Sequence, residues 1–393
     1  MLSQQACSLM IALAYFIGSC SNATQNETKK SRPKIDDINV LAALPMEVQV
    51  PLNNLITKEK ILLGKLLFFD PILSGGKDIA CATCHHPSSG FAENIDLSIG
   101  VNGKGFSSHR TFLIPNDIPF VKRNSQSIIN TAYNGISNEG IGDVTFAPMF
   151  WDLRVRSLEK QALEPLKAFE EMRGHSLNEN EVISKILERL RNNTKYQILF
   201  KQAFQETDAI NEVNLGKAIA TYERTIIAKN TRFDQYMRGD KMALSQKEID
   251  GMLAFLKSGC SKCHNGPMFS DFKAHILGVT DNEKLTVADD GIQKKHAFRT
   301  PSLRNLRFTF PYMHNGKLKT LENVLQFYED LSGGKVSNSK LSIVQMDPLI
   351  DHLKVDFKDI SIIVEFLNTL NDESYDKKLP KSVPSGLKVG GNI

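Results

Sequence analysis

The chain has 393 residues, enough for two or three domains that each bury a core. Hydrophobic residues make up 41% and charged residues 23%, which is the composition of an ordinary soluble protein rather than a disordered one. The formal net charge is only +4 and the two signs are interspersed, which argues against a nucleic-acid partner.

The N-terminus reads as an export signal. Residues 6–18, ACSLMIALAYFIG, form an apolar run too short to span a bilayer, and a polar stretch follows it. We therefore predict a signal peptide at residues 1–19 and a linker at 20–38. The run ends in IGSC, which resembles a bacterial lipoprotein cleavage box with Cys20 as the lipidated residue. Plain cleavage and a short membrane anchor are the alternatives.

Two distant segments share the pattern Cys-x-x-Cys-His: CATCH at residues 81–85 and CSKCH at 260–264. The two Cys pairs of a structural zinc site usually lie about 15–20 residues apart, and a redox dithiol has no use for the histidine. Attachment of a c-type haem needs all three residues, because two thioethers tether the porphyrin and the histidine ligates iron. We predict two covalently bound haems, held by Cys81, Cys84, His85, Cys260, Cys263 and His264.

Helices and long loops dominate the rest of the chain, and strand signals are weak. Apolar residues recur at spacings of three and four in residues 182–204, 213–228, 244–259 and 360–370. The third of these stretches opens with a capping box, Ser245 to Glu248. The irregular stretches 100–148 and 269–311 are long enough to wrap a cofactor. The predicted fold is all-α, with two cytochrome c-like haem domains and long haem-wrapping loops.

Residues 149–172, MFWDLRVRSLEKQALEPLKAFEEM, resemble the bacterial dihaem cytochrome c peroxidases and their relative MauG, which matures methylamine dehydrogenase. In that family a tryptophan is followed by a glutamine ten residues later and a glutamate twenty residues later. Trp151, Gln161 and Glu171 match these offsets. The resemblance continues in residues 122–135 and 298–316 and extends from about residue 55 to about residue 370.

The resemblance implies a catalytic role for each of these three residues. Glu171 would move protons above the N-terminal haem during peroxide reduction, with Gln161 as a hydrogen-bonding neighbour and Trp151 carrying electrons between the haems. A carboxylate over an open haem face can take a proton from one peroxide oxygen and return it to the other. From the residues alone, Glu171 also fits a solvated helix charge and Trp151 a core aromatic.

The sixth ligand of the C-terminal haem differs within the family. In the peroxidases it is a methionine fourteen residues after the histidine of a PY-x-H motif, and MauG has a tyrosine there. Counting fourteen residues from His314 reaches Tyr328. A tyrosine ligand favours ferric iron, whereas a methionine raises the potential. Met313 and Met346 are alternative ligands, and Tyr328 also fits the apolar face of a helix.

Four further positions depart from the family pattern or stand beside it. Leu153 replaces a glycine, and would crowd a tight turn if the position needs positive φ. Asn315 replaces the aspartate that follows His314. No histidine stands at the offset of the residue that caps the N-terminal haem in several peroxidases, and His109 lies too early to replace it. His86 we interpret as a surface or supporting residue.

The resemblance also implies a calcium ion between the domains, held partly by backbone carbonyls of Asn124, Thr309 and Pro311. The implied partners are hydrogen peroxide and a small electron-donor cytochrome or cupredoxin, without nucleic acid, and the implied assembly is a homodimer. We expect a periplasmic protein of a Gram-negative bacterium, anchored at Cys20 if that residue is lipidated.

The expected organisation is an N-terminal peroxidatic domain at 39–238, a C-terminal electron-transfer domain at 239–375 and a tail at 376–393. The expected activity is reduction of hydrogen peroxide to water at the N-terminal haem, with electrons delivered through the C-terminal haem. One alternative is a MauG-like enzyme that uses peroxide to oxidise an organic or protein substrate, which Tyr328 favours. The other is a passive dihaem electron carrier, which Glu171 argues against.

Overall fold

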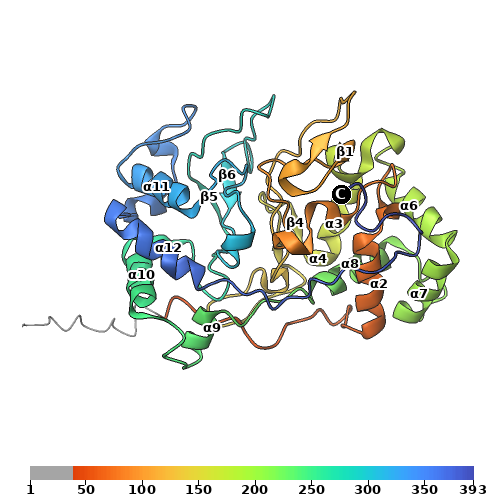
Figure 1. Ribbon diagram of the computed structural model, residues 1–393, viewed down its shortest axis with the longest axis horizontal. Coiled ribbons are helices and arrows are strands. Elements are labelled where there is room, and N and C mark those ends of the chain that lie inside the picture. Colours follow the sequence, from red (N-terminus) through yellow and green to blue (C-terminus); the bar gives the residue numbers. More distant parts are fainter. Residues whose placement is uncertain (1–38) are drawn as a thin grey trace, which may run out of the picture.

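The computed structural model describes residues 39–393 and shows a mostly helical protein with few strands (Figure 1). This confirms the predicted fold class in its coarse form. The helices are α2 (Lys58–Phe69), α3 (Cys81–Cys84), α4 (Leu158–Gln161), α5 (Glu164–Lys167), α6 (Val182–Arg191), α7 (Thr194–Phe204), α8 (Glu212–Glu223), α9 (Arg232–Met237), α10 (Gln246–Lys257), α11 (Leu321–Ser332) and α12 (Ile360–Asn368).

The strands form three short antiparallel pairs. They lie in or beside the stretches expected to be irregular, together with single turns of 3-10 helix. Each strand has only two or three residues, so the sheets brace loops rather than build a layer. The pairs are β1 (Gly103–Lys104) with β2 (Thr111–Phe112), β3 (Pro148–Met149) with β4 (Val155–Arg156), and β5 (Ala274–Ile276) with β6 (Ala297–Arg299).

Local capping explains where the predicted helices begin. The stretch 182–204 is divided into α6 and α7 because the Asn193 side chain accepts a hydrogen bond from the backbone N–H of Tyr196 and starts a new helix. The capping box that opens α10 is confirmed: Ser245 Oγ accepts from the backbone N–H of Glu248, and the Glu248 carboxylate accepts from the Ser245 backbone N–H.

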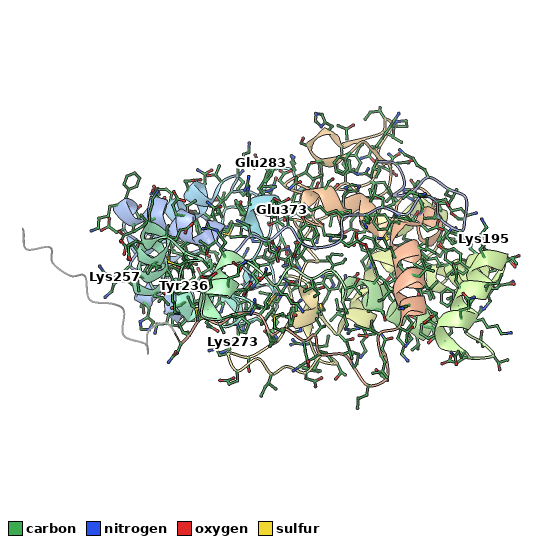
Figure 2. The ribbon with its side chains drawn as sticks, turned by 60° about the horizontal axis from the view of Figure 1, so that its bottom comes forward. Lys195, Tyr236, Lys257, Lys273, Glu283 and Glu373 are labelled. Atoms are coloured by element: carbon green, nitrogen blue, oxygen red, sulfur yellow. The ribbon has the colours of Figure 1, made fainter. Side chains whose placement is uncertain are left out.

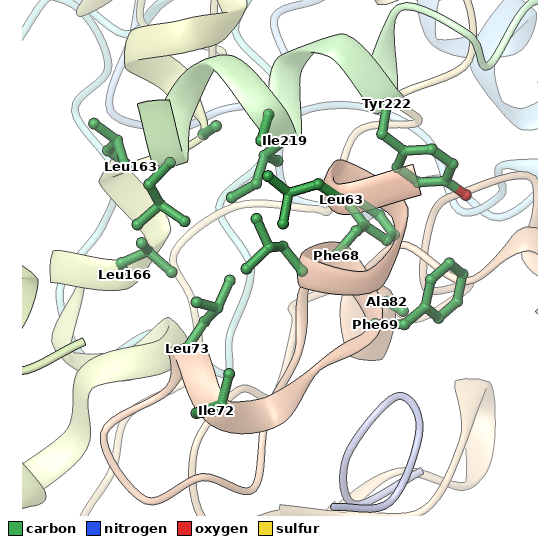
Figure 3. Packing of buried hydrophobic residues seen from close by; sticks show 14 of the residues in the cluster. Leu63, Phe68, Phe69, Ile72, Leu73, Ala82, Leu163, Leu166, Ile219 and Tyr222 are labelled. Atoms are coloured by element: carbon green, nitrogen blue, oxygen red, sulfur yellow. The ribbon is translucent and has the colours of Figure 1, made fainter. Parts of the chain in front are cut away.

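Two helix pairs form the frame of the molecule. In the first, α2 packs on α8, and Leu63 and Phe68 of α2 lie against Ile219 and Tyr222 of α8 (Figure 3). A Cβ added to Gly64 of α2 would lie 2.0 Å from a backbone carbonyl oxygen of α8, so only glycine permits this approach. In the second pair, α10 packs on α12.

The two pairs belong to two separate apolar cores, and the two ends of the described chain cross between them. The first core contains α2, α6, α7 and α8, and the second contains α10 and α12. Leu41, near the start of the described chain, packs in the second core, whereas Tyr375 and Val383, near its end, pack in the first. The domain boundaries stay a prediction, but burial of apolar surface does not follow them.

The last segment, residues 376–393, runs back to the first core, and we call it the C-terminal strap (Figure 1). The Ser385 hydroxyl donates to Oδ1 of buried Asp70 over 2.6 Å. The Thr83 hydroxyl, inside the first Cys-x-x-Cys-His segment, donates to the carbonyl oxygen of Gly390 over 2.8 Å. The strap therefore contacts the first attachment segment directly.

The surface carries side chains of both charge signs, with Lys195 and Lys257 toward opposite ends of the molecule (Figure 2). Between residues 39 and 393, no helix combines the length and the apolar character needed to cross a bilayer. The predicted signal peptide, the linker and Cys20 lie outside the described residues.

Candidate functional site

A cavity of about 660 Å³ is lined by both Cys-x-x-Cys-His segments. All the residues predicted to hold haem, to act on peroxide or to bind calcium line this one cavity. They are Cys81, Cys84, His85, Asn124, Trp151, Gln161, Glu171, Cys260, Cys263, His264, Thr309, Pro311 and Tyr328. Residues up to 247 positions apart in sequence are thus brought together, as a shared site requires.

The two motif histidines are held in the form that binds iron. His85 Nδ1 lies 3.1 Å from the Phe91 carbonyl oxygen, and His264 Nδ1 lies 2.9 Å from that of Phe269. A carbonyl only accepts hydrogen bonds, so Nδ1 carries the proton and Nε2 presents its lone pair. Burial lowers the pKa of both rings, which keeps them neutral at physiological pH. Both sites therefore fit a haem with one axial histidine.

The four motif cysteines are all free of disulfides, as haem attachment requires. Cys263 also lies within metal-binding reach of Asp271 and His275. His275 is already held between two carboxylates, 2.9 Å from Asp271 and 2.7 Å from Asp347. Because a thioether would occupy the Cys263 sulfur, this group is better described as a His–carboxylate clamp beside the second attachment segment than as a metal site.

Glu171 lies on a single turn of π-helix, residues 169–173, and faces the cavity. Such turns are often found at functional sites. Burial raises the pKa of Glu171 to about 7, and the charge of Glu170 contributes in the same direction. Burial is the main cause that raises the pKa of the Cys81 and Cys84 thiols, and the charge of Glu171 adds a smaller contribution, which places Glu171 near the first attachment segment. At neutral pH this carboxyl is poised to bind or release a proton.

Besides Ser98, two more polar side chains line the cavity with atoms that have no hydrogen-bond partner within the described chain. One is Gln161, at the end of α4, whose Oε1 is unpaired. The other is Glu223, the last residue of α8, whose Oε2 is unpaired. Burial raises the pKa of Glu223 to about 8. Sequence reasoning missed Glu223, although its spacing of four from Ile219 places a carboxyl on the apolar face of α8.

Trp151 is buried and lies at the centre of a small aromatic group. Its indole N–H donates to the carbonyl oxygen of Asn124 over 3.0 Å. Its ring meets His314 edge-on at 6.5 Å between centroids, and His314 stacks on Phe298 at 3.6 Å. The Asn124 carbonyl assigned to calcium is therefore also the acceptor that fixes the tryptophan. The calcium site itself stays a prediction.

Tyr328 projects from α11 into the cavity near the second attachment segment. Burial raises the pKa of its hydroxyl above the usual range, with smaller contributions from Cys263 and Cys260. Of the alternative ligands, Met313 also lines the cavity, whereas Met346 is buried in an apolar cluster and does not. Tyr328 and Met313 thus remain as the candidate sixth ligands.

The departures from the family pattern have distinct structural outcomes. Leu153 does adopt positive φ, +58°, so a residue with a Cβ occupies the left-handed conformation that favours glycine. Asn315 donates to a backbone carbonyl over 2.8 Å. His109 is exposed and does not line the cavity, as expected for a surface residue. His86 is also absent from the lining and bonds to a neighbouring serine.

Comparisons with known proteins agree with this geometry. Residues 58–242 match a family model described as di-haem cytochrome c peroxidase. The chain is 31% identical over 373 residues to methylamine utilization protein MauG of Methylorubrum extorquens, covering 94% of each chain. It is 30% identical over 330 residues to cytochrome c551 peroxidase of Nitrosomonas europaea, covering 82% of this chain and 83% of that one.

Among solved structures, a MauG-like protein associated with microbial copper homeostasis superposes with a TM-score of 0.67 at 25% identity, covering 84% of this chain and 95% of that one. Likeness over almost the whole chain, together with two attachment segments that line one cavity, leads to a single assignment: the chain belongs to the family of di-haem cytochrome c peroxidases and MauG.

Proposed function

We propose that the protein reduces hydrogen peroxide to water at the haem held by Cys81, Cys84 and His85, with electrons arriving through the haem of the second segment. The observation that carries this proposal is Glu171, a buried carboxyl in the shared cavity whose pKa burial raises to about 7. When bound, the haem supplies an iron that binds peroxide and passes it electrons.

The protein's own part in this reaction is mainly proton transfer. Reduction of one peroxide consumes two electrons and two protons and forms two water molecules. Glu171 takes the proton of one peroxide oxygen and delivers it to the departing one, which a carboxyl with a pKa near neutrality does well. The unpaired Oε1 of Gln161 offers an acceptor for a substrate hydrogen. Trp151, fixed by Asn124, provides a rigid aromatic ring in the same cavity for electron transfer.

The setting of this reaction follows from the sequence. The apolar N-terminal run supports export to the periplasm, and IGSC supports lipidation of Cys20. A small cytochrome or cupredoxin is the electron donor expected in that compartment, and it would approach the second attachment segment. The halves at 39–238 and 239–375 would then be the peroxidatic and the electron-transfer domain.

A second candidate function is a MauG-like oxidation, in which peroxide is used to oxidise an organic or protein substrate. Tyr328 favours it, because α11 brings this hydroxyl into the cavity near Cys263 and Cys260. A tyrosine ligand favours ferric iron and so disfavours simple storage of an electron at the second haem.

Replacement of Glu171 by glutamine tests the main proposal. Glu171→Gln keeps the shape but loses the transferable proton, so we expect peroxide turnover with a reduced cytochrome to fall by roughly 10²–10⁴-fold. Both haems should remain, as measured by the pyridine haemochrome spectrum. Glu188→Gln is the matched control, because Glu188 is an exposed glutamate on α6 that pairs with Lys185. Normal turnover in the Glu171 variant would remove the acid–base role.

A further inference from the structure

Arg299, at the end of β6, is a buried cation without an acidic partner. Only 6% of its surface is exposed, and it lines the cavity. Its Nε donates to the Phe150 carbonyl over 2.9 Å and its Nη2 donates to Gln126 Oε1 over 3.1 Å, and both acceptors are neutral. No residue between 39 and 393 forms an ion pair with it. Burial lowers the pKa of the guanidinium to about 10, and no carboxylate counteracts this.

The other arginines that line the cavity are all paired. Arg123 lies 2.7 Å from Asp152, and Arg154 lies 2.9 Å from the same carboxylate. Arg304 forms two hydrogen bonds of 2.9 Å with buried Asp234. Buried charges in proteins are paired because desolvation without compensation is costly. Arg299 is therefore placed for an anion that the described chain does not itself supply.

Arg299 lies where the two haem sites meet. Ser125, the neighbour of its partner Gln126, donates its hydroxyl to the Cys84 carbonyl oxygen over 2.9 Å. Thr300, the residue after Arg299, accepts over 2.7 Å from the hydroxyl of Ser270, and Ser270 directly follows the carbonyl that holds the ring of His264. The Arg299 backbone N–H donates to the carbonyl of Trp151 over 2.7 Å. The guanidinium thus bridges the loop of the first haem site and the loop of the second haem site, next to Trp151.

We propose that the Arg299 guanidinium, positioned by Gln126, binds a propionate carboxylate of a bound haem at this junction. A c-type haem is attached through thioethers, and its two propionates are its only anionic substituents. A guanidinium matches a carboxylate in charge and in fork geometry. The proposal depends on the two haems of the family and is independent of the peroxide chemistry.

The contact has a measurable electrostatic consequence. A fixed cation at the haem edge favours the reduced iron, which carries one positive charge less, and so raises the reduction potential. The propionate belongs to either haem, and the haem whose potential responds identifies which one.

The test is redox titration of Arg299→Gln and Arg299→Lys, with each haem followed by its own spectrum. We expect the glutamine variant to lower the midpoint potential of one haem and the lysine variant to retain most of the original value. Arg307→Gln is the control, because it removes the same formal charge from an exposed residue that lies outside the cavity.

Haem content separates the remaining outcomes. Full loading of haem with both potentials unchanged in Arg299→Gln would overturn the proposal. Incomplete loading in Arg299→Gln that Arg299→Lys restores would support it, since any cation serves a carboxylate in part. Equal failure of both variants to bind haem would overturn it, because charge would then not be what the site provides.

Discussion

The two attachment regions are built on the same frame and differ in what faces the cavity. In each, a helix before the Cys-x-x-Cys-His segment carries a glycine whose added Cβ would lie 2.0 Å from a carbonyl oxygen of the second helix: Gly64 of α2 against α8, and Gly251 of α10 against α12. The first region presents Glu171 and the second presents Tyr328. The frame therefore holds a haem, while a few side chains decide what that haem does.

The likeness extends to the loops after the motifs. Asn130 and Asn305 both adopt a left-handed conformation and both precede a 3-10 turn. Each donates its backbone N–H to the chain just after the second helix of its pair, Asn130 over 2.9 Å and Asn305 over 3.2 Å. The residue six positions before Asn130 is neutral Asn124, whereas the residue six positions before Asn305 is cationic Arg299. The cation at the junction is thus a feature of the second half alone.

Removal of the part of the C-terminal strap beyond residue 384 should produce the largest difference between the two halves. A chain ending at residue 384 loses two buried hydrogen bonds, of Ser385 to Asp70 and of Thr83 to Gly390, together with the apolar contacts of the strap's last residues. We expect the free energy of unfolding to fall by about 3–5 kcal/mol. In haem absorption spectra followed through denaturation, the first site should be lost early. Lys381→Ala, at an exposed strap position, is the control, and equal weakening of both sites would contradict the assignment.

Substitution of the glycines at the helix crossings should have the second largest effect. Gly64→Ala and Gly251→Ala each force a methyl group into a backbone carbonyl, which should cost about 1–3 kcal/mol or more. Each variant should weaken its own half in urea denaturation. Gly333→Ala serves as the control, because the nearest atom to its added methyl group, the Asp330 carbonyl oxygen, would lie 3.3 Å away. Equal effects of the two alanines on both halves would show that the frames are not independent.

Replacement of Tyr328 by methionine tests how the ligation of the second haem differs from that of the first. If Tyr328 ligates the second haem, Tyr328→Met raises the potential of that haem and Tyr328→Phe changes its ligation spectrum. The first haem should be unaffected in electron paramagnetic resonance. Met313→Leu tests the competing ligand. A spectrum that responds only to the Met313 variant would return Tyr328 to a packing role.

The smallest effect should be a shift in pH dependence confined to the first site. Glu171 acts as a base when ionised, so kcat/KM should fall as pH drops through about 7. The negative charge of Glu170 raises the pKa of Glu171, so Glu170→Gln should move this acid limb to lower pH, by less than about one unit. A pH–rate profile measures it. Movement to higher pH would mean that another group controls the limb.

Much of the site was predictable because its chemistry depends on local spacing. The Cys-x-x-Cys-His segments, the offsets from Trp151 and the capping box at Ser245 are short-range patterns. Helix α2 escaped prediction because KEKILLGKLLFF is apolar around most of its circumference and shows no clear amphipathic spacing. Arg299 escaped because its significance lies in the absence of an acidic neighbour, which only the folded chain reveals.

The repeated frame was also invisible in the sequence, since few of its matching positions share residue type. Asn130 and Asn305 agree in identity, but most of their neighbours do not. Each half shares only one left-handed asparagine and one glycine at a helix crossing with the other. Two such residues are too few to reveal a repeat before the packing of the helices is known.

The crossing of the chain ends has a consequence for assembly. The backbone N–H of Gly266, beside the second motif, donates to Val40 at the start of the described chain, while the strap closes over the first motif. The first attachment segment is therefore complete only once the strap, more than 300 residues further along the chain, has folded against it. Each half is thus completed by a segment from the opposite end of the described chain.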